Sequence, residues 1–548
     1  MTSRSLGHRA PLLWLLLPYM AGLAIGKAGD FLPVSWLLAL ALVAVLIAGA
    51  ALIMGGRRAA LWGPALISAM VVAGAASYAL HRLRLATWET LPPREASLGL
   101  QVDRVFVPAD PKRASGLATI VRAAPHLREL IGQPIYFSLN LRAGEAPPIR
   151  SALVTATGIL VTLPRNPPAE TFDGYLAGAG INFRFTRGRL TAEDRPAHPY
   201  YRFCAELGKR CHELLGLGIE TKRPALAGLL RAMMLGTTHD LSTEQHTLFM
   251  QSGTMHLFAI SGLNIGVIAG VLQAGLLLLR FPGWARFVVG AGLLWVFVDV
   301  TGAAPSAIRA FAMAVFIQAA FVFRRPANML AALVASAFAV LLLWPLQMFS
   351  ASFLMSYFIV TALLVLGLPL GEAWVERWAP WRDLPVVTWG RWHRAVDAAW
   401  RNTTLAVAIG LATTLVSLLT GLQFFQLLTP GALAANLVLI PAAVIVTLGG
   451  FASIMCGLIG FTPGAVLCNH AAAVVLLIIE WLVRLSVKIP GAFLAARFAH
   501  PWVGPASLIA LLAALLAGYA AAWRPSRGSW WPPFAIVALV LIFGVNFG

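Results

Sequence analysis

Polar and small side chains interrupt four of the long apolar runs in this 548-residue sequence. A polar group in hydrocarbon costs free energy unless it faces a partner or a water-filled cavity. Such interruptions therefore mark either helix packing or a hydrated path through a membrane. The interrupting residues are His256, Ser261, Gly262 and Asn264 in the first run, Asp299, Thr301, Gly302, Pro305, Ser306 and Arg309 in the second, Ser352 and Ser356 in the third, and Gln423, Gln426, Asn436 and Pro441 in the fourth.

The chemistry that these residues favour is the binding of an anion. Glycine and proline breaks unwind membrane helices, and the half-helices that follow present N–H groups and partial positive charge at their N-termini. Phosphate oxygens suit such a site, and Arg309 would add a guanidinium able to make a bidentate phosphate contact. The alternative is packing, because small residues let helices approach and polar side chains bond across them. An Asp299–Arg309 ion pair that orders two helices, and interfacial solvation of His256, also remain open.

The sequence lacks the usual signatures of catalysis and metal binding. It contains no HxH, HExxH or HxHxDH, no GxxxxGK[ST] phosphate loop and no GxSxG elbow. Its four cysteines include no CxxC and are too few for a disulfide framework. We therefore expect a protein that is not an enzyme and that holds no metal and no cofactor.

Composition places these residues in a polytopic α-helical membrane protein. Hydrophobic residues make up 59% of the chain and charged residues only 11%, whereas a soluble domain is about half apolar and a quarter charged. The formal net charge is +19. An excess of Lys and Arg in cytoplasmic loops accounts for such a charge, although it would also attract a polyanion such as nucleic acid. Charge alone therefore does not establish a DNA partner.

Four regions follow one another along the chain. Residues 1–95 hold about three N-terminal transmembrane helices, and residues 254–548 a transmembrane domain of about eight to ten spans. Between them, residues 96–197 contain no span but five short alternating or β-branched runs, which predicts an inserted small β-barrel. An OB-like barrel is one option and an SH3-like barrel another. Residues 198–253 show helical spacing with charges on one side, which is typical of interfacial amphipathic helices.

Basic residues between the apolar runs predict the orientation. Arg4 and Arg9, with the Arg57-Arg58 pair, place the N-terminus in the cytoplasm and the β-domain outside. The segment 372–401, with five arginines and six tryptophans, then lies inside. We expect a helix on the cytoplasmic face there, because tryptophan concentrates at the interface; a base-stacking surface is the alternative. The same alternation places Arg280, Arg286, Arg324, Arg325, Arg524 and Arg527 inside, but Lys488 and Arg497 outside.

Five segments in order resemble motifs of the ComEC family, the inner-membrane DNA channel of natural transformation. They are NPPAETFDGYLAGAGI (166–181), HLFAISGLNIG (256–266), TGAAPSAIRAFAM (301–313), SASFLMSYFIV (350–360) and GLQFFQLLTPGALAANLVLIPAA (421–443). The resemblance implies a multi-pass protein of the bacterial cytoplasmic (inner) membrane that passes one strand of incoming DNA into the cytoplasm. It also implies partners: single-stranded DNA, a periplasmic DNA receptor, a cytoplasmic motor or single-strand-binding protein, and membrane lipid.

The resemblance further implies that the extracytoplasmic OB-like domain receives the DNA. A basic groove with stacking aromatic side chains suits single strands. The candidates lie in one expected strand and are Phe183, Arg184, Phe185, Arg187 and Arg189. In a regular strand successive side chains alternate between the two faces. Arg187 and Arg189 would therefore share one face, and Arg184 would lie on the other.

Three departures from the family pattern matter. Asn264 stands where the family usually has histidine, which favours hydrogen bonding over proton transfer there. Trp344-Pro345 replaces the common Asp-Pro and removes an acid. Many members also end in a metallo-β-lactamase-like domain, whose HxHxDH motif this sequence lacks. We therefore expect any nuclease to be a separate chain.

The residues alone predict a basic polytopic transporter or channel of undetermined substrate, and the resemblance supplies the cargo. We expect transport of single-stranded DNA across the cytoplasmic membrane during natural transformation. The alternatives are a transporter or flippase for another anionic polymer or lipid, and a membrane assembly scaffold that transports nothing.

Overall fold

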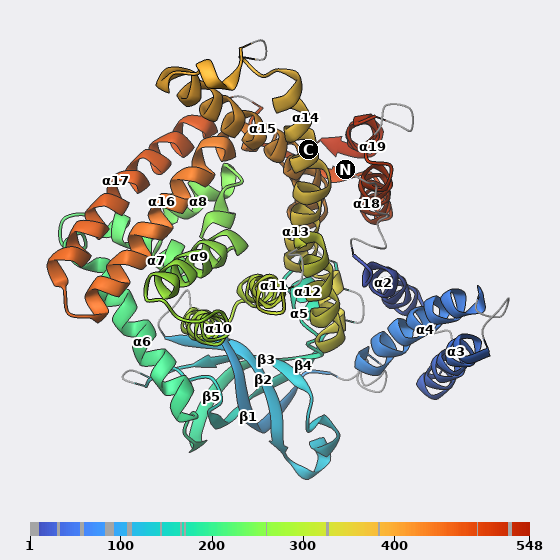
Figure 1. Ribbon diagram of the computed structural model, residues 1–548. Helices are drawn as coiled ribbons and strands as arrows, with labels where there is room; N and C mark the ends of the chain where they lie inside the picture. Colours follow the sequence, from blue (N-terminus) through green and yellow to red (C-terminus); the bar gives the residue numbers. More distant parts are fainter. Residues whose placement is uncertain are drawn as a thin grey trace.

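Long apolar helices make up most of the chain in the computed structural model (Figure 1). The structure describes residues 10–547 apart from 30–32, 55–59, 83–91, 107–111, 143–144, 165–166, 169–170, 259, 325–327, 382–383, 490 and 524–528. Among these described residues, ten helices are long and apolar enough to cross a membrane. Several arginines used to predict the orientation lie outside the described residues, namely Arg4, Arg9, Arg57, Arg58, Arg325, Arg524 and Arg527.

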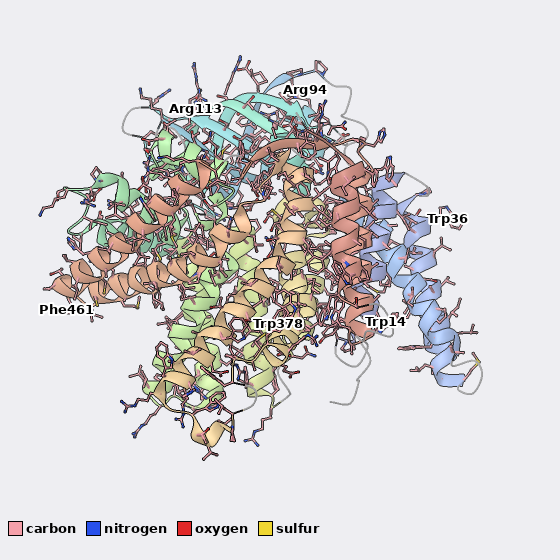
Figure 2. All side chains as sticks on the ribbon, turned by 90° about the horizontal axis from the view of Figure 1, so that it is seen from above. Trp14, Trp36, Arg94, Arg113, Trp378 and Phe461 are labelled. Atoms are coloured by element: carbon pink, nitrogen blue, oxygen red, sulfur yellow. The ribbon has the colours of Figure 1, made fainter. Side chains whose placement is uncertain are left out.

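The N-terminal helices are α2 (Leu13–Ala28), α3 (Val34–Met54) and α4 (Trp62–Arg82). Helices α2 and α4 approach closely, since a Cβ on Gly22 would overlap the carbonyl of Val71. Helix α3 buries only Ala48 and Ala51 among its described residues. Its other apolar side chains face outward, including Trp36, which lies at the edge of the molecule in Figure 2. An apolar outer surface suits a helix in contact with lipid.

A closed β-barrel follows, built from β1 (Arg94–Phe106), β2 (Arg113–Ala123), β3 (Pro134–Asn140), β4 (Leu153–Thr162) and β5 (Phe183–Arg195). The strand order is β1-β2-β3-β5-β4, and β1 pairs with β4 to close the barrel. Strands β3 and β5 are parallel, whereas the other pairs are antiparallel. A five-stranded barrel with this crossed order is OB-like, which confirms that expectation over the SH3-like one.

The barrel interior follows from the two-residue period of its strands. In β3, for example, Ile135, Phe137 and Leu139 are buried in the core while the residues between them face outward. The β2–β3 connection contains the 3₁₀ helix η3 (Pro125–Leu130), and the β4–β5 connection contains helix α5 (Phe172–Gly178). The labelled barrel residues Arg94 and Arg113 lie together at one end of the molecule in Figure 2.

Helices α6 (Pro199–Gly216) and α7 (Pro224–Leu235) connect the barrel to the membrane domain. Helix α6 buries Cys204, Cys211 and Leu215 and exposes most of its charged side chains, as expected of an amphipathic helix. Helix α7 differs from the interfacial helix that the sequence predicts, because every residue from Leu226 to Leu235 is buried. It shares one apolar core with side chains of α9, α16 and α17.

The rest of the chain is almost entirely helical. Its elements are η4 (Thr238–Asp240), α8 (Thr243–Gln251), η5 (Met255–Leu257), α9 (Gly262–Leu278), α10 (Gly283–Val300), α11 (Pro305–Val322), α12 (Met329–Leu343), η6 (Pro345–Phe349), α13 (Ala351–Ala362), η7 (Leu363–Gly367), α14 (Leu368–Arg377), η8 (Val386–Thr388), α15 (Arg391–Phe425), α16 (Ala432–Leu458), α17 (Thr462–Val487), α18 (Val503–Ala520) and α19 (Trp531–Phe543). Three short strands, β6 (Leu427–Leu428), β7 (Leu494–Phe498) and β8 (Val545–Phe547), form a small sheet.

The expectation of a separate surface helix within residues 372–401 is wrong for the part of this segment that the structure describes. Helix α13 continues through the π-helical turn η7 into α14, which ends at Arg377, and α15 begins at Arg391. Residues 372–377 and 391–401 are therefore the ends of two long apolar helices. No proline or glycine interrupts these two stretches, so helical hydrogen bonding propagates beyond the apolar part.

Candidate functional site

Each of the first three interruptions is the start of a helix. Ser261 precedes α9, and its hydroxyl accepts a hydrogen bond from the Asn264 amide at 3.3 Å. Ser350 caps α13 in the same way, accepting from the Phe353 amide at 3.2 Å. Helix α11 begins with Pro305 at its first position. Serine caps and an initial proline are common helix-start signals, and they place three N-termini inside the helical domain.

Side-chain contacts hold these three helix starts together. The Ser306 hydroxyl of α11 donates to the Ile260 carbonyl, just before α9, at 2.7 Å. Arg309 of α11 donates through Nη2 to the Ser352 carbonyl at 2.7 Å and to the Ser352 hydroxyl at 2.6 Å, in the first turn of α13. Helix N-termini carry partial positive charge and free N–H groups. The three starts and one guanidinium therefore form a positively charged cluster, here called the Arg309 cluster.

The guanidinium of Arg309 is buried but only partly satisfied. The residue is 1% exposed, and its Nε and Nη1 have no hydrogen-bond partner among the described residues. Within that same part of the chain, no carboxylate lies within ion-pair distance of it. An unpaired buried charge is costly. Both nitrogens are N–H donors of the kind that bind phosphate or carboxylate oxygens.

The alternative that Asp299 and Arg309 form an ion pair is wrong. The Asp299 carboxylate, whose side chain is 1% exposed, instead pairs with Arg150 of the barrel at 2.6 Å. It also accepts a hydrogen bond from the Tyr200 hydroxyl of α6 at 2.8 Å. Burial, together with the Asp299 hydrogen bond and charge, raises the pKa of Tyr200. The phenol therefore keeps its proton at physiological pH and acts as a donor.

The turn between α10 and α11 is the second place where the barrel meets the helices. Gly302 has a φ of +81°, a left-handed conformation that favours glycine, while the Thr301 hydroxyl donates to the Val298 carbonyl at 2.9 Å. Arg104 of β1 donates through Nε to the Gly302 carbonyl at 3.3 Å. The barrel therefore contacts the turn that precedes α11.

Helix α5 of the barrel domain meets the start of α13. A Cβ placed on Gly178 would lie 3.2 Å from the Ser350 Cβ, and one on Gly180 would lie 3.8 Å from Leu346 in η6. The barrel is therefore placed over the helix starts that form the Arg309 cluster.

Asn264 has a packing role in this structure, whereas His256 has a contact within its own turn. Asn264 is buried; its Nδ2 donates to the Met233 carbonyl at 3.2 Å, and its Oδ1 accepts from the Thr447 hydroxyl at 3.2 Å. It thereby links α9 to α7 and α16. His256 is exposed, with Nδ1 3.1 Å from the Gly253 carbonyl of its own turn.

The remaining candidates of the third and fourth interruptions do not join the Arg309 cluster by any hydrogen bond of the described residues. Ser356 lies one turn beyond Ser352 on α13 and is partly buried. Gln426 ends α15 with a left-handed φ of 52°, and its carbonyl accepts from the Ala496 amide at 3.1 Å. Pro441 lies inside α16, where it removes one helical hydrogen bond. Buried side-chain oxygens without a partner among the described residues occur at Gln423 and Asn436.

The barrel candidates require a correction. Phe183 and Phe185 are 1% and 0% exposed and belong to the barrel core, so they cannot stack on bases. Arg184 faces outward and pairs with Asp173 of α5 at 2.8 Å. A bulge in β5, where Phe137 and Leu139 of β3 oppose Phe185 and Gly188, shifts the alternation.

The bulge also resolves the parity problem that the sequence raises. Arg187 takes a φ of 52° within the bulge. As a result Arg187 and Arg189 are exposed, and Arg184 is partly exposed on the outside of the same strand. No sequence rule places a bulge at this position, because it depends on the pairing of β5 with both neighbours.

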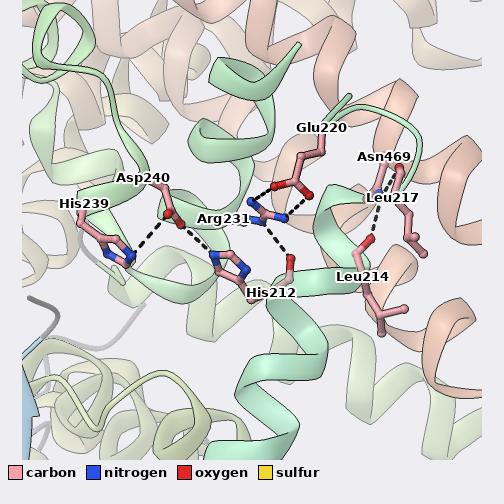
Figure 3. A network of polar contacts seen from close by, with 8 residues as sticks. All are labelled: His212, Leu214, Leu217, Glu220, Arg231, His239, Asp240 and Asn469. Atoms are coloured by element: carbon pink, nitrogen blue, oxygen red, sulfur yellow. Dashed lines mark hydrogen bonds and ion pairs between the residues drawn. The ribbon is translucent and has the colours of Figure 1, made fainter. Parts of the chain in front are cut away.

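A polar network that the sequence does not reveal joins α6, α7, η4 and α17 (Figure 3). Arg231 of α7 makes a bidentate pair with Glu220, with distances of 2.8 and 2.7 Å, and donates through Nε to the His212 carbonyl at 2.8 Å. His212 and His239 contact opposite oxygens of Asp240 at 3.1 and 3.3 Å. Among the described residues there is no group of three possible ligands that could hold a metal ion.

This network supports the fold. The hydrogen bonds and charge of Arg231 hold the pKa of Glu220 below its usual range. Burial alone would raise the pKa of Asp240, but the hydrogen bond from His212 and the charges of His239 and His212 help to outweigh it and lower that pKa. Asn469 of α17 donates to the last carbonyls of α6, those of Leu214 and Leu217, at 2.8 and 3.0 Å. Such contacts satisfy a helix C-terminus in an apolar setting.

Comparison with known proteins gives one family and one relative. The family model described as Competence protein matches residues 233–523, which is more than half of the chain. ComE operon protein 3 of Bacillus subtilis (strain 168) is 28% identical over 199 residues, which cover 36% of this chain. The matched region spans only 25% of that relative's length. No solved structure shows significant similarity to the chain.

Proposed function

Because the chain belongs to the Competence protein family, we propose that it carries single-stranded DNA across the cytoplasmic membrane during natural transformation. Membership of the family gives it a role in competence and DNA uptake, and its apolar helices make it a multi-pass membrane protein. The single strand, the transport step and the cytoplasmic membrane are the proposed part.

The observation that supports the proposal best is the unpaired guanidinium of Arg309. Arg309 lies near the start of α11 and bonds to the first turn of α13, where the partial positive charges of these two helix starts add to its own. Contacts to phosphate position a strand without reading its sequence. A path for transforming DNA has to accept any sequence, so recognition of the backbone by the Arg309 cluster suits that task.

The proposal assigns the other steps of uptake to other chains. A phosphate contact holds a strand but does not drive it, so we assign the energy to a cytoplasmic motor or single-strand-binding partner. A periplasmic receptor would deliver the DNA to the barrel, and a separate nuclease would remove the other strand. The chain itself is proposed to be no enzyme and to need no cofactor.

The test compares Arg309→Ala and Arg309→Lys with wild type at matched protein abundance. We expect Arg309→Ala to lower DNase-protected uptake of labelled DNA by at least about tenfold, since a charge-assisted hydrogen bond contributes about 1.5–3 kcal/mol. Arg309→Lys should retain part of the uptake, because lysine keeps the positive charge but lacks the paired N–H groups of a guanidinium. Arg484→Ala is the matched control: Arg484 is partly exposed and already paired with Glu244 and Glu480.

Normal uptake in Arg309→Ala at wild-type abundance would contradict the proposal and favour a scaffold role. Unchanged transformation with altered membrane-lipid composition in a deletion strain would favour a lipid transporter instead. If both Arg309 variants reduce abundance to the same degree as uptake, Arg309 serves the packing of α11 and α13.

A further inference from the structure

Four aromatic side chains form a continuous cluster on the outside of the barrel. Phe106 ends β1, Tyr136 lies on β3, and Phe172 and Tyr175 lie on α5. The Phe106–Tyr136 and Phe172–Tyr175 ring pairs are stacked, with centroids 6.2 and 6.0 Å apart. Tyr136 meets Phe172 edge-on at 5.2 Å, and Phe106 lies 6.3 Å from Tyr175. Each ring therefore contacts two others of the group.

The rings do not belong to the core of the barrel. Phe172 is 46% exposed and Tyr175 37% exposed, while Phe106 and Tyr136 are half-buried. Leu176 and Ala177 of α5 are buried in a small apolar cluster with Leu163 and Ile181. That burial fixes α5 against the barrel and leaves its two rings on the surface. Large exposed aromatic groups held in fixed positions are typical of a binding surface.

Two guanidinium groups lie over this aromatic surface. That of Arg104 is 5.3 Å from the Phe106 ring centre, and that of Arg184 is 6.0 Å from the Phe172 ring centre. Both distances are within the range of cation–π contacts. The Arg184 side chain is 35% exposed despite its pair with Asp173, so its charge remains available to a ligand at the surface.

The cluster lies where an OB-like barrel usually binds an oligonucleotide. Such barrels use the face of their second and third strands together with the loops after β1 and β4. Phe106 stands at the end of β1, Tyr136 on β3, and α5 in the β4–β5 connection. The same residues adjoin the helical domain, because Arg104 donates to the Gly302 carbonyl and α5 touches Ser350. The surface thus leads directly to the starts of α11 and α13.

We propose that Phe106, Tyr136, Phe172 and Tyr175, with Arg104 and Arg184, form a platform on which the bases of a single DNA strand stack before the strand meets the Arg309 cluster. The inference rests on the proposed function for its cargo and adds how the strand is held. Aromatic rings stack on any base, whereas a duplex keeps its base faces covered. The platform therefore selects a single strand over a duplex without selecting a sequence.

The test measures binding of fluorescent strands to the full-length protein in lipid nanodiscs. One probe is oligothymidylate of about 12 nucleotides, within the usual site size of an OB barrel. The other is an abasic strand of equal length, which keeps the phosphates but has nothing to stack. Wild type should bind oligothymidylate at least about fivefold more tightly than the abasic strand. Phe172→Leu should lower the ratio of these two affinities by about fivefold. Abasic binding should not change.

Two further variants make the result specific. Phe172→Trp should keep the preference, because indole offers a larger stacking face. Phe203→Leu alters an aromatic residue of α6 that is 57% exposed and lies outside the cluster, so it should have no effect. Equal binding of the two probes by wild type would overturn the platform. The platform would also be overturned if Phe172→Leu bound oligothymidylate as tightly as wild type and lost thermal stability only in nanodiscs that contain phosphatidylglycerol. The rings would then be anchors at the membrane interface.

The platform and the proposed transport can fail separately. A base preference that persists in Arg309→Ala supports the platform, because that substitution is in the helices beyond it. Normal cellular uptake in Arg309→Ala would overturn the proposed role of the Arg309 cluster while leaving the nanodisc result to stand on its own.

Discussion

Arg309 and Asn264 are both buried polar residues near the starts of membrane helices, but their surroundings differ. The Asn264 amide has partners on both sides, in Met233 and Thr447. The Arg309 guanidinium has one serine residue as its partner and two nitrogens with none among the described residues. A satisfied buried group serves the fold, whereas an unsatisfied one calls for an explanation such as a ligand. For this reason we assign Asn264 to packing and propose a ligand for Arg309.

We expect Asn264→Ala to lower stability and to spare transport. The substitution leaves the Met233 carbonyl, at the end of α7, buried without its donor, which costs about 1–3 kcal/mol. Thermal unfolding in detergent should show the loss, and DNA uptake per folded molecule should remain at the wild-type level. Asn264→Ala with unchanged stability and lost uptake would instead place Asn264 in the transport path.

At the same scale, the sequence identified the polar residues but not their partners. Asp299 and Arg309 are ten residues apart in the chain, yet Asp299 binds Arg150, which is 149 residues away. Only the docking of the barrel on the α10–α11 turn brings those two together. The spacing of residues in a helix predicts contacts within that helix, and it contains no information on which loop covers its end.

The helices and the barrel are joined through the Asp299 contact, which links three elements. Arg150 precedes β4, Tyr200 is in the first turn of α6, and Asp299 ends α10. Apolar runs predicted the membrane helices as a class, because a long apolar segment fits a bilayer. The same signal missed where α14 ends and α15 begins, since charged residues that are good helix formers continue a helix beyond its apolar part.

We expect Arg150→Ala to destabilise the barrel–helix junction more than Asp299→Asn. Removing Arg150 leaves the Asp299 carboxylate buried and unpaired, whereas Asp299→Asn leaves a partly exposed arginine that water can solvate. Because Arg150 is a third exposed, the difference should be about 1–2 kcal/mol rather than the full cost of a buried charge. Hydrogen exchange at the α10–α11 turn and thermal unfolding would measure it.

A double-mutant cycle supplies the control for this junction. The Arg150→Ala, Asp299→Asn double variant should be more stable than the sum of the single effects predicts, as residues in direct contact usually show. Arg122→Ala is the matched control for Arg150→Ala. Arg122 also pairs with an aspartate, Asp194, but on the barrel surface, where 69% of the Arg122 side chain is exposed. Additive effects at Arg150 and Asp299 would show that the pair does not couple the two parts.

At the scale of the whole molecule, the barrel lies at one end of the helices, and Arg280 and Arg324 lie at the ends of α9 and α11. Helix α11 starts beside the barrel, and α9 starts beside α11. The two helices have 18 and 17 residues, so each is about 25 Å long. Arg280 and Arg324 follow the C-terminal ends of these two helices. The positive-inside rule predicts that this end faces the cytoplasm, which would place the barrel and its proposed aromatic platform outside, where incoming DNA arrives.

Single cysteines at the two ends test this orientation. Ile131 follows η3 in the barrel and is 47% exposed, and Val387 lies between α14 and α15 and is 95% exposed. The native Cys204, Cys211, Cys456 and Cys468 would be replaced to remove background labelling. In spheroplasts, a membrane-impermeant maleimide should label Ile131→Cys and not Val387→Cys, whereas inverted membrane vesicles should give the opposite pattern. Labelling of Val387→Cys in spheroplasts would put the barrel in the cytoplasm, where it could not receive DNA from outside.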